Sequence, residues 1–219
     1  MSTPLLAFRA RAYAALGDTT RLAIIDLLAA TDLPSGAVAG QLDIPTNLLA
    51  HHLRILEAAE LIVRRRSEGD GRRSYLQRTA ASYELIGAPA TPLPRRVAFV
   101  CSANSARSQL AERYWRSISS IPATSAGTHP AARVHPRAVA TAHRHGLDLT
   151  DATPRLLQET LTDDDLIITV CDRAYEETPN AALHWSVPDP VRHDAADSFE
   201  QAFGEIARRV DLLAHHTLS

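Results

Sequence analysis

A proline-rich segment divides this sequence into two halves of different character. The nine residues from Ile86 to Pro94 (Ile-Gly-Ala-Pro-Ala-Thr-Pro-Leu-Pro) contain three prolines and a glycine. Proline has no backbone N–H and clashes with the preceding helical turn, so this segment forms neither a helix nor a central strand. A chain of 219 residues has room for two modest domains. We therefore predict an α/β protein with domains at residues 1–86 and 96–219, joined by a semi-rigid linker at 87–95.

Helical patterns dominate the first half. They predict helices over residues 5–16, over a segment capped by Asp18 or Thr19, over residues 35–42, and over a segment that Thr46 caps. Residues 61–66 and 72–77 are predicted as two strands around a glycine-rich turn. Helix, short helix, turn, helix and hairpin is the order of a winged helix-turn-helix, which is mostly α.

In such a fold, the helix from Thr46 enters the DNA major groove and the arginine-rich hairpin lies over phosphates. The hairpin arginines could instead form a charged edge that blocks aggregation. Five arginines lie on the hairpin that directly follows the helix-turn-helix, and this favours contact with DNA phosphates. Adjacent helix residues do not share a face, so we expect one of His51 and His52 to face DNA and the other to pack, and we expect no metal site. The candidate DNA-binding residues are Thr46, Asn47, His51, Arg54, Arg64, Arg65, Arg66, Arg72 and Arg73.

Three segments of this half, residues 16–22, 51–56 and 59–66, resemble the ArsR-type metalloregulatory repressors. The resemblance covers roughly residues 3–85. It implies a double-stranded DNA operator as partner and a homodimer that pairs through its terminal helices. Residues 1–86 contain no cysteine, which excludes an arsenite sensor built from thiolates of this domain alone.

The second half begins with a strand, a short loop and a helix. The apolar run Val97–Val100 predicts a buried strand that ends at Cys101, and a helical pattern follows Arg107. Loop N–H groups and the positive end of the helix dipole then converge on one point, where the Arg107 guanidinium can bind an oxyanion bidentately. The same field favours the thiolate of Cys101, with Ser108 as a hydrogen-bond donor to the sulfur. The predicted oxyanion loop comprises Ser102, Ala103, Asn104, Ser105, Ala106 and Arg107.

Alternating strands and helices continue to the end of the sequence. Strands are predicted at residues 123–127, 166–171 and 184–187, and helices at 136–145, 154–161 and 199–215. This alternation indicates a doubly wound parallel sheet, whose ligands bind at the carboxyl ends of the strands. Cys101, Cys171 and Asp189 all follow strands, so we expect them at the same edge.

Residues 96–216 resemble the low-molecular-weight tyrosine phosphatase fold and, within it, the thioredoxin-coupled arsenate reductases. The resemblance rests on the Cys101–Ser108 loop, Ser125–Thr128, Val134–Ala138, Gly146–Leu149, His184-Trp185 and Asp189-Pro190. It implies that Cys101 is the nucleophile, that Asp189 is the general acid, and that Cys171 attacks the nucleophile's sulfur. Thr178 stands where these reductases carry a further cysteine, and Ala103 and Ala106 replace a glycine and a cysteine of the family loop. The last step of the thiol cascade therefore needs a thiol from outside this chain.

Several alternatives remain at this point. Asp189 could be a turn former and Cys171 an inert thiol at a strand end. The leading hypothesis is a DNA-binding repressor fused to an arsenate reductase, with arsenate or phosphate as the oxyanion. An aryl or protein-tyrosine phosphatase is a second reading, and a non-catalytic repressor that senses an oxyanion or arsenite is a third. We expect no bound cofactor and no metal, and as reductant either a thioredoxin-type dithiol or a low-molecular-weight thiol.

Net charge, cysteine count and the length of apolar runs limit the possible partners and the cellular compartment. The net charge of −2 gives no global basic field, and the two cysteines are too few for a disulfide scaffold. No apolar run is long enough to span a bilayer, and residues 1–9 lack the basic-then-apolar order of a secretory signal. We therefore expect no membrane partner and a cytoplasmic location, since a thiolate nucleophile suits a reducing compartment.

Overall fold

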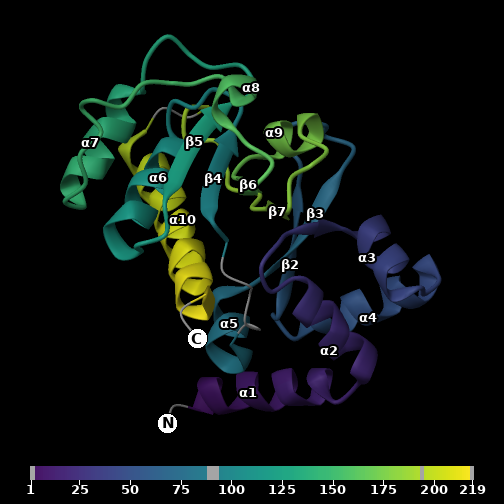
Figure 1. Cartoon of the computed structure of the whole chain (residues 1–219). Coiled ribbons are helices and arrows are strands. Elements are labelled where there is room, and N and C mark those ends of the chain that lie inside the picture. Colours follow the sequence, from purple (N-terminus) through teal and green to yellow (C-terminus); the bar gives the residue numbers. More distant parts are fainter. Residues whose placement is uncertain (1–2, 88–93, 193–194, 218–219) are drawn as a thin grey trace. The chain divides into compact units, whose positions relative to one another are not determined.

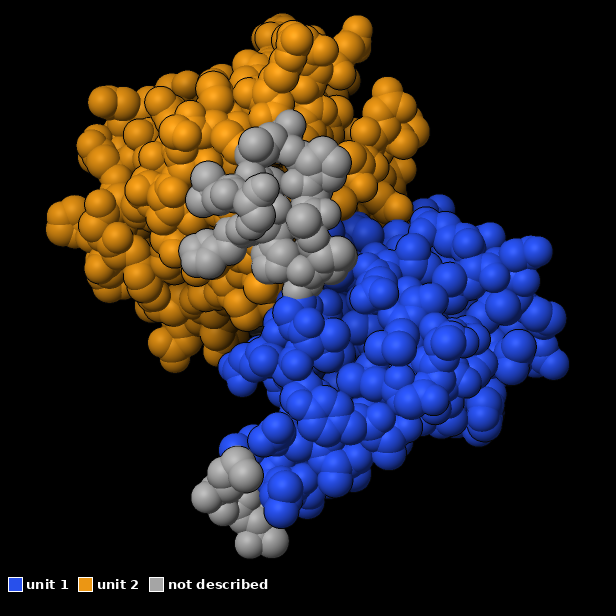
Figure 2. Space-filling view, turned by 60° about the horizontal axis from the view of Figure 1, so that its bottom comes forward, with its two compact units in different colours: residues 1–66, 71–89 blue, residues 67–70, 90–219 orange. Residues whose placement is uncertain are grey.

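The computed structural model describes residues 3–87, 94–192 and 195–217, and the chain forms two compact units (Figure 2). One unit comprises residues 1–66 and 71–89, and the other comprises residues 67–70 and 90–219. Most of the predicted linker, residues 88–93, lies outside the described residues.

Five helices are described in the first unit: α1 (Thr3–Leu16), α2 (Thr19–Leu27), α3 (Ser35–Leu42), α4 (Thr46–Ala58) and α5 (Ala80–Ile86). The four predicted helices are confirmed, and the Asp18 carboxylate caps α2 by accepting the Arg21 N–H at 3.0 Å. The prediction that Thr46 caps α4 is wrong: Pro45 occupies the cap position with φ −60°, and Thr46 is the first helical residue. Proline's fixed φ is compatible with an extended cap, which displaces threonine by one position.

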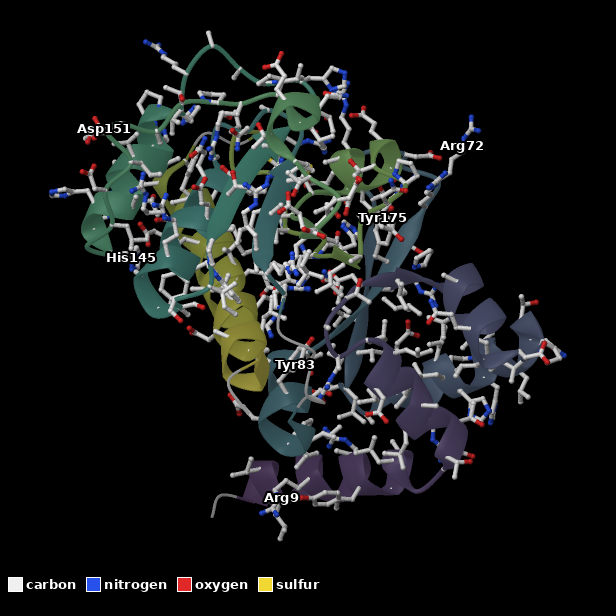
Figure 3. All side chains as sticks on the ribbon, viewed as in Figure 1. Arg9, Arg72, Tyr83, His145, Asp151 and Tyr175 are labelled. Carbon is white, nitrogen blue, oxygen red and sulfur yellow. The ribbon has the colours of Figure 1, made fainter. Side chains whose placement is uncertain are left out.

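The same unit contains a three-stranded antiparallel sheet of order β1-β3-β2, formed by Leu33–Pro34, Ser74–Arg78 and Ile62–Arg66. The hairpin is confirmed, but its second strand begins at Ser74, so Arg72 and Arg73 lie in the turn instead of on the strand. The two-residue β1 and the helix α5 were not predicted. Tyr83, which Figure 3 labels, anchors α5, because its hydroxyl donates to the carbonyl of Ala29 at 2.9 Å.

The second unit is built on a four-stranded parallel sheet of order β5-β4-β6-β7 (Figure 1). Its strands are Ala123–Gly127, Arg96–Cys101, Asp165–Thr169 and Leu183–His184. The predicted parallel sheet is confirmed. The apolar runs of β4 and β6 occupy its centre, as expected for strands that are covered on both faces.

Helices connect and cover these strands: α6 (Arg107–Ile118), α7 (Pro136–Arg144), α8 (Leu157–Thr160), α9 (Asp172–Glu177) and α10 (Ala196–Thr217). The helix predicted at 154–161 is shorter, because Leu156 instead forms a β-bridge with Gly127. The strand predicted to reach Cys171 ends at Thr169, because Cys171 caps the unpredicted helix α9. The strand predicted at 184–187 pairs only through Leu183 and His184.

The main core of the second unit lies between the sheet and the helices α6 and α10. Phe99 of β4 packs against Trp115 of α6 and against Trp185, with ring centroids 6.2 and 5.9 Å apart. Burial of such large aromatic side chains fixes α6 against β4. This positions the loop that joins them, residues 102–106. Within the described residues, no helix combines the length and apolar composition that crossing a bilayer requires.

Candidate active site

Cys101 ends the central strand β4, and its sulfur is surrounded by hydrogen-bond donors. The Asn104 backbone N–H donates to Sγ at 3.2 Å, and the Ser108 hydroxyl lies 3.0 Å from Sγ. The Ser108 oxygen also accepts from Asn104 Nδ2 at 2.8 Å, and its own proton stays available to a thiolate at Cys101. Both donors therefore stabilise negative charge on Cys101.

Asn104 is the centre of a buried network that holds the loop in shape. Its φ of +47° lies in the left-handed region, which asparagine tolerates better than most residues. Its amide nitrogen donates to Ser108 and, at 2.9 Å, to Ser125 of β5. Its oxygen accepts from Gln109 Nε2 at 3.0 Å and from the Arg155 N–H at 2.8 Å. The amide thus satisfies all its polar capacity in one orientation, which makes the loop rigid.

The backbone of the segment after β5 holds the outer side of the loop. The N–H groups of His129, Ala131 and His135 donate at 2.8 to 2.9 Å to the carbonyls of Ser102, Ala103 and Ser105. With these carbonyls engaged on the outside, the loop N–H groups are left to face an anion, as in a backbone anion nest.

Gly127 allows this close approach of the loop to β5. A Cβ at position 127 would lie 2.7 Å from the Ser102 carbonyl oxygen and 3.0 Å from Asn104. A Cβ atom essentially never lies 2.7 Å from another heavy atom, so only glycine fits at position 127 while the loop keeps its place.

Arg107 is the first residue of α6, and its guanidinium is buried beside Asp189. Nη2 lies 3.2 Å from Asp189 Oδ1, and Nη1 donates to the Val187 carbonyl at 2.9 Å. Burial alone would lower the pKa of Arg107, but neighbouring groups, Cys171 and Asp189 foremost, raise it above its ordinary value. The guanidinium is therefore positively charged, and its contacts with Asp189 and the Val187 carbonyl fix its orientation beside the loop.

Cys171 lies next to this loop, two residues after the adjacent strand β6 ends. The Val170 N–H donates to the Val100 carbonyl at 2.7 Å, so the residues that precede Cys171 and Cys101 are hydrogen-bonded neighbours. Both thiols are free and buried, and Cys171 Sγ lies 3.5 Å from the Ser102 hydroxyl. Burial raises the pKa of the Cys171 thiol, and the positive charge of Arg107 offsets this only in part.

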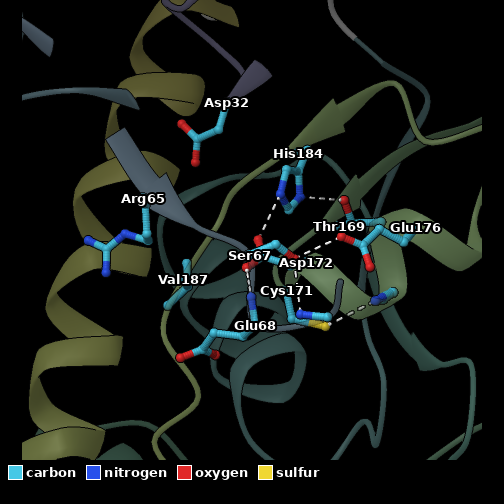
Figure 4. A network of polar contacts seen from close by, with 12 residues as sticks. Asp32, Arg65, Ser67, Glu68, Thr169, Cys171, Asp172, Glu176, His184 and Val187 are labelled. Atoms are coloured by element: carbon cyan, nitrogen blue, oxygen red, sulfur yellow. Dashed lines mark hydrogen bonds and ion pairs between the residues drawn. The ribbon is translucent and has the colours of Figure 1, made fainter. Parts of the chain in front are cut away.

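A buried hydrogen bond between His184 and Asp172 holds the start of α9, the helix that Cys171 caps. His184 Nε2 lies 3.1 Å from Asp172 Oδ1, and His184 Nδ1 lies 3.0 Å from the Thr169 hydroxyl (Figure 4). Tyr175 stacks on the imidazole with ring centroids 4.2 Å apart. Burial would raise the pKa of Asp172, but hydrogen bonds, led by that from His184, hold it below its ordinary value.

These elements surround a cavity of about 640 Å³. Cys101, Arg107, Cys171 and Asp189 all line it. The structure thus brings the predicted nucleophile, anion ligand, second thiol and acid to one place, at the carboxyl ends of β4 and β6 as expected for a parallel sheet. Its other lining residues are Ser102, Ala103, Ser105, Ala106, Asp172, Arg173, Glu176, Glu177, Val191, Arg192 and residues 68–70.

Two features of the site qualify the sequence analysis. Ala103 has no positive φ, so alanine in place of the family glycine does not distort the loop. Sequence reasoning placed Asn104 in the loop but missed the network behind it, in which Glu112 accepts from Ser125 at 2.6 Å and from Arg155 at 2.9 Å. The polar stretch Arg107–Glu112 at the start of a largely buried helix was the available signal, because buried polar side chains must find partners.

In the first unit, the candidate DNA-contacting residues of α4 share an exposed face. Asn47, His51 and Arg54 are exposed, whereas His52 is buried 3.7 Å from Asp18. One histidine therefore packs as expected, and the contact of His51 with DNA stays a prediction. Thr46 is exposed at the start of the helix.

The hairpin arginines are partly engaged within the unit. Arg64 lies 3.4 Å from Glu57, Arg65 donates to Gln77 at 2.9 Å, and Arg66 donates to the Gly71 carbonyl. Arg72 and Arg73 are exposed in the turn. The charged hairpin is present, and its role in phosphate contact stays a prediction.

The family of low molecular weight phosphotyrosine protein phosphatases matches residues 96–219. The chain belongs to this family. The match spans the sheet, the Cys101 loop, Cys171 and Asp189, and it leaves residues 1–95 outside.

Two similar relatives carry the name arsenate reductase. The "Glutaredoxin arsenate reductase" of Synechocystis sp. is 30% identical over 127 residues, 54% of this chain and 95% of that protein. The "Arsenate reductase" of Halalkalibacterium halodurans is 30% identical over 129 residues, 53% of this chain and 92% of that protein. Among solved structures, the tyrosine phosphatase Wzb from Escherichia coli K30, in complex with sulphate, is 18% identical with a TM-score of 0.51. It covers 56% of this chain and 98% of that one, and at this identity it shows the fold alone.

Proposed function

We propose that residues 96–219 catalyse the thiol-dependent reduction of arsenate to arsenite. The observation that carries this proposal is the presence of two free cysteines, at the ends of neighbouring strands, that line one cavity together with Arg107. A phosphatase needs only one thiol. A second thiol at this place gives the site a means of moving two electrons.

The reaction begins with arsenate on the loop N–H groups and Arg107. The Cys101 thiolate attacks arsenic while Asp189 protonates a departing oxygen, which leaves as water. Ser108 donates to the sulfur in the free site and releases it as the S–As bond forms. This first half requires the same groups whether the central atom is arsenic or phosphorus.

The second half needs a thiol that attacks the sulfur of Cys101. Cys171 first loses its proton to water. Its thiolate then forms an S–S bond with Cys101, the S–As bond breaks, and the electron pair of that bond remains on arsenic as arsenite. Two thiols are oxidised to one disulfide, and arsenic(V) is reduced to arsenic(III). An external dithiol or low-molecular-weight thiol then reduces the disulfide, because position 178 is threonine and offers no third thiol.

An aryl or protein-tyrosine phosphatase is the second candidate, because the Arg107–Asp189 pair serves both reactions and the buried Cys171 thiol disfavours only the reduction. Phosphoryl transfer to Cys101 needs the loop, the guanidinium and an acid to protonate the leaving oxygen, and the 3.2 Å contact keeps that acid at the anion site. Burial keeps Cys171 protonated at neutral pH, which slows the reductive branch but not this one.

Turnover of arsenate with a dithiol or a monothiol, measured beside hydrolysis of an aryl phosphate, separates these candidates. We expect arsenite production in the parent, its loss in Cys101→Ser, and severe weakening in Arg107→Lys, because a point charge does not replace the planar fork. Aryl phosphate hydrolysis alone would assign the phosphatase. Binding of phosphate or arsenate without turnover of either substrate would assign a non-catalytic oxyanion sensor.

For the first unit we propose a winged helix-turn-helix that binds a double-stranded DNA operator as a homodimer. The exposed face of α4 and the arginines of the β2–β3 hairpin support DNA contact. On α1, Leu5, Leu6 and Tyr13 are 48, 56 and 52% exposed, which supports burial of this helix against a second copy. A chain that remains monomeric at micromolar concentration and does not bind duplex DNA would contradict this part of the proposal.

A further inference from the structure

The second unit includes four residues that are distant in sequence from the rest of it, Ser67–Asp70. They lie at the cavity that contains Cys101, and Glu68, Gly69 and Asp70 line it. Neither the reduction of arsenate nor the hydrolysis of an aryl phosphate, as derived above, uses any of them.

Two carboxylates of α9 hold this segment by its backbone. Asp172 Oδ2 accepts the Glu68 N–H at 2.7 Å, and Glu176 Oε2 accepts the Asp70 N–H at 2.8 Å. The Ser67 hydroxyl donates to Glu176 Oε1 at 2.8 Å (Figure 4). Asp172 and Glu176 stand four residues apart and therefore share one face of the helix.

The segment approaches α9 as closely as its sequence permits. A Cβ at Gly69 would lie 2.4 Å from Glu176 Oε2 and 3.0 Å from the Arg173 Cα, so only glycine fits without a shift of its neighbours. Arg192, from the loop after Asp189, donates to the Glu68 carbonyl at 2.7 Å. The backbone of Glu68 is thus fixed on both sides.

This fixation directs the Glu68 carboxylate toward the oxyanion site. Its Oε2 accepts the backbone N–H of Asp189 at 2.8 Å and lies 3.9 Å from Arg107 Nη1. A carboxylate presents two oxygens and a negative charge, the same features by which arsenate or phosphate would engage the guanidinium. We propose that Glu68 is an internal carboxylate ligand of the oxyanion site and competes with the incoming oxyanion for Arg107.

This inference rests on the oxyanion site of the proposed function and adds a residue that sets its affinity. An oxyanion that reaches Arg107 meets the charge of Glu68 at close range, so either the side chain swings away or the anion binds less tightly. Displacement also disturbs residues 67–70, which are the first part of the turn between β2 and β3. Oxyanion binding and the state of this turn are therefore linked, and linkage is reciprocal.

The test is the dissociation constant of inorganic phosphate, measured by titration calorimetry on the full chain. Glu68→Gln keeps the size of the side chain and an oxygen that accepts the Asp189 N–H, but removes the charge. We expect it to bind phosphate about tenfold more tightly than the parent, because the substitution removes one negative charge whose repulsion of the anion is only partly screened by solvent. Glu177→Gln is the matched control: it removes a carboxylate from the same cavity, one that pairs with Arg173 at 3.1 Å instead of Arg107.

A second measurement follows the turn directly by hydrogen exchange. Saturating phosphate should speed exchange of the Glu68 and Asp70 amides in the parent, because their acceptors on α9 are released when the turn moves. If the parent binds phosphate and Glu68→Gln binds it no more tightly, the role of Glu68 is overturned while the oxyanion site stands. If neither protein binds phosphate, the oxyanion site itself is refuted, and this inference with it.

Discussion

The hydroxyl of Ser108 lies 3.0 Å from the sulfur of Cys101, and its oxygen is already occupied as an acceptor by the side-chain amide of Asn104. That contact leaves the hydroxyl proton available to a Cys101 thiolate, which has no proton of its own to donate. It also connects the nucleophile to the network that runs through Asn104 to Ser125 and Glu112.

The first prediction concerns this donor. Ser108→Ala should slow the reaction of Cys101 with iodoacetamide near neutral pH about tenfold, since a hydrogen bond to a charged group is worth about 1.5–3 kcal/mol. Ser117→Ala is the control, because that serine lies on the same helix and its hydroxyl donates to the Tyr114 carbonyl instead. Equal alkylation rates in all three proteins would remove Ser108 from the activation of the nucleophile.

A second prediction uses the raised pKa of Cys171. Burial keeps this thiol protonated at neutral pH, so iodoacetamide should label Cys101 there and label Cys171 only well above pH ~8.5, the ordinary thiol value. The raised folded-state pKa also means that Cys171 stabilises the fold below pH ~8.5, and that this stabilisation is lost as the pH rises through the raised value. Mass spectrometry of the labelled peptides across pH measures the first effect. Equal labelling of the two cysteines at neutral pH would contradict it.

Cys171→Ser should separate the two chemistries of the site. Arsenate turnover with an external dithiol should fall at least about tenfold, because the intramolecular attack on Cys101 is lost and its effective concentration advantage goes with it. Aryl phosphate hydrolysis should continue, since phosphoryl transfer needs only Cys101, Arg107 and Asp189. Undiminished arsenate reduction by the variant with every thiol tried would make Cys171 a structural residue.

Gly127→Ala should disturb the loop without touching any reacting group. The new Cβ would lie 2.7 Å from the Ser102 carbonyl oxygen, so the free energy of unfolding should fall by about 1–3 kcal/mol and phosphate affinity should fall with it. Gly204→Ala is the control with the opposite expected sign. A Cβ added at position 204 of α10 would meet no atom within 4 Å outside the adjacent backbone, so alanine should stabilise that helix by about 0.5–1 kcal/mol. Denaturant unfolding of both variants measures the pair. A stable Gly127→Ala with parental phosphate affinity would show that the loop can move away from β5.

For the proposed DNA-binding unit, Asn47→Ala and Arg65→Ala should affect DNA binding in different ways. Asn47 lies on the exposed face of α4, so its loss should relax base preference while non-specific binding persists. Arg65→Ala should weaken binding to all sequences alike and reduce the salt slope by about one unit. Arg144→Ala, which removes an exposed arginine paired with Glu200 in the second unit, serves as the control. Titrations of duplex DNA at several salt concentrations distinguish these outcomes, and identical behaviour of all three variants would contradict the proposed surface.

Much of this architecture follows from local sequence signals. The prolines before residue 95 separate two halves, the apolar runs of β4 and β6 predict a parallel sheet, and Asp18 marks the start of α2. These signals are short-range, since proline fixes its own φ and a cap bonds to residues within one turn. The sequence therefore determined the order of the longer elements and the common edge of Cys101, Cys171 and Asp189, but not the short elements β1, α5 and α9.

Only the tertiary structure decided how residues far apart in the chain share one polar network. Nothing local to Asn104 predicts that its amide bonds Ser125 and the backbone of Arg155. Nothing local to Glu68 predicts that its carboxylate reaches the N–H of Asp189, 121 positions away. The side-chain periodicity of a strand or helix reports which face is buried, but not which partner a buried polar group meets. That partner depends on the packing of β5 against β4 and of residues 67–70 against α9, because a hydrogen bond forms only within a narrow range of distances.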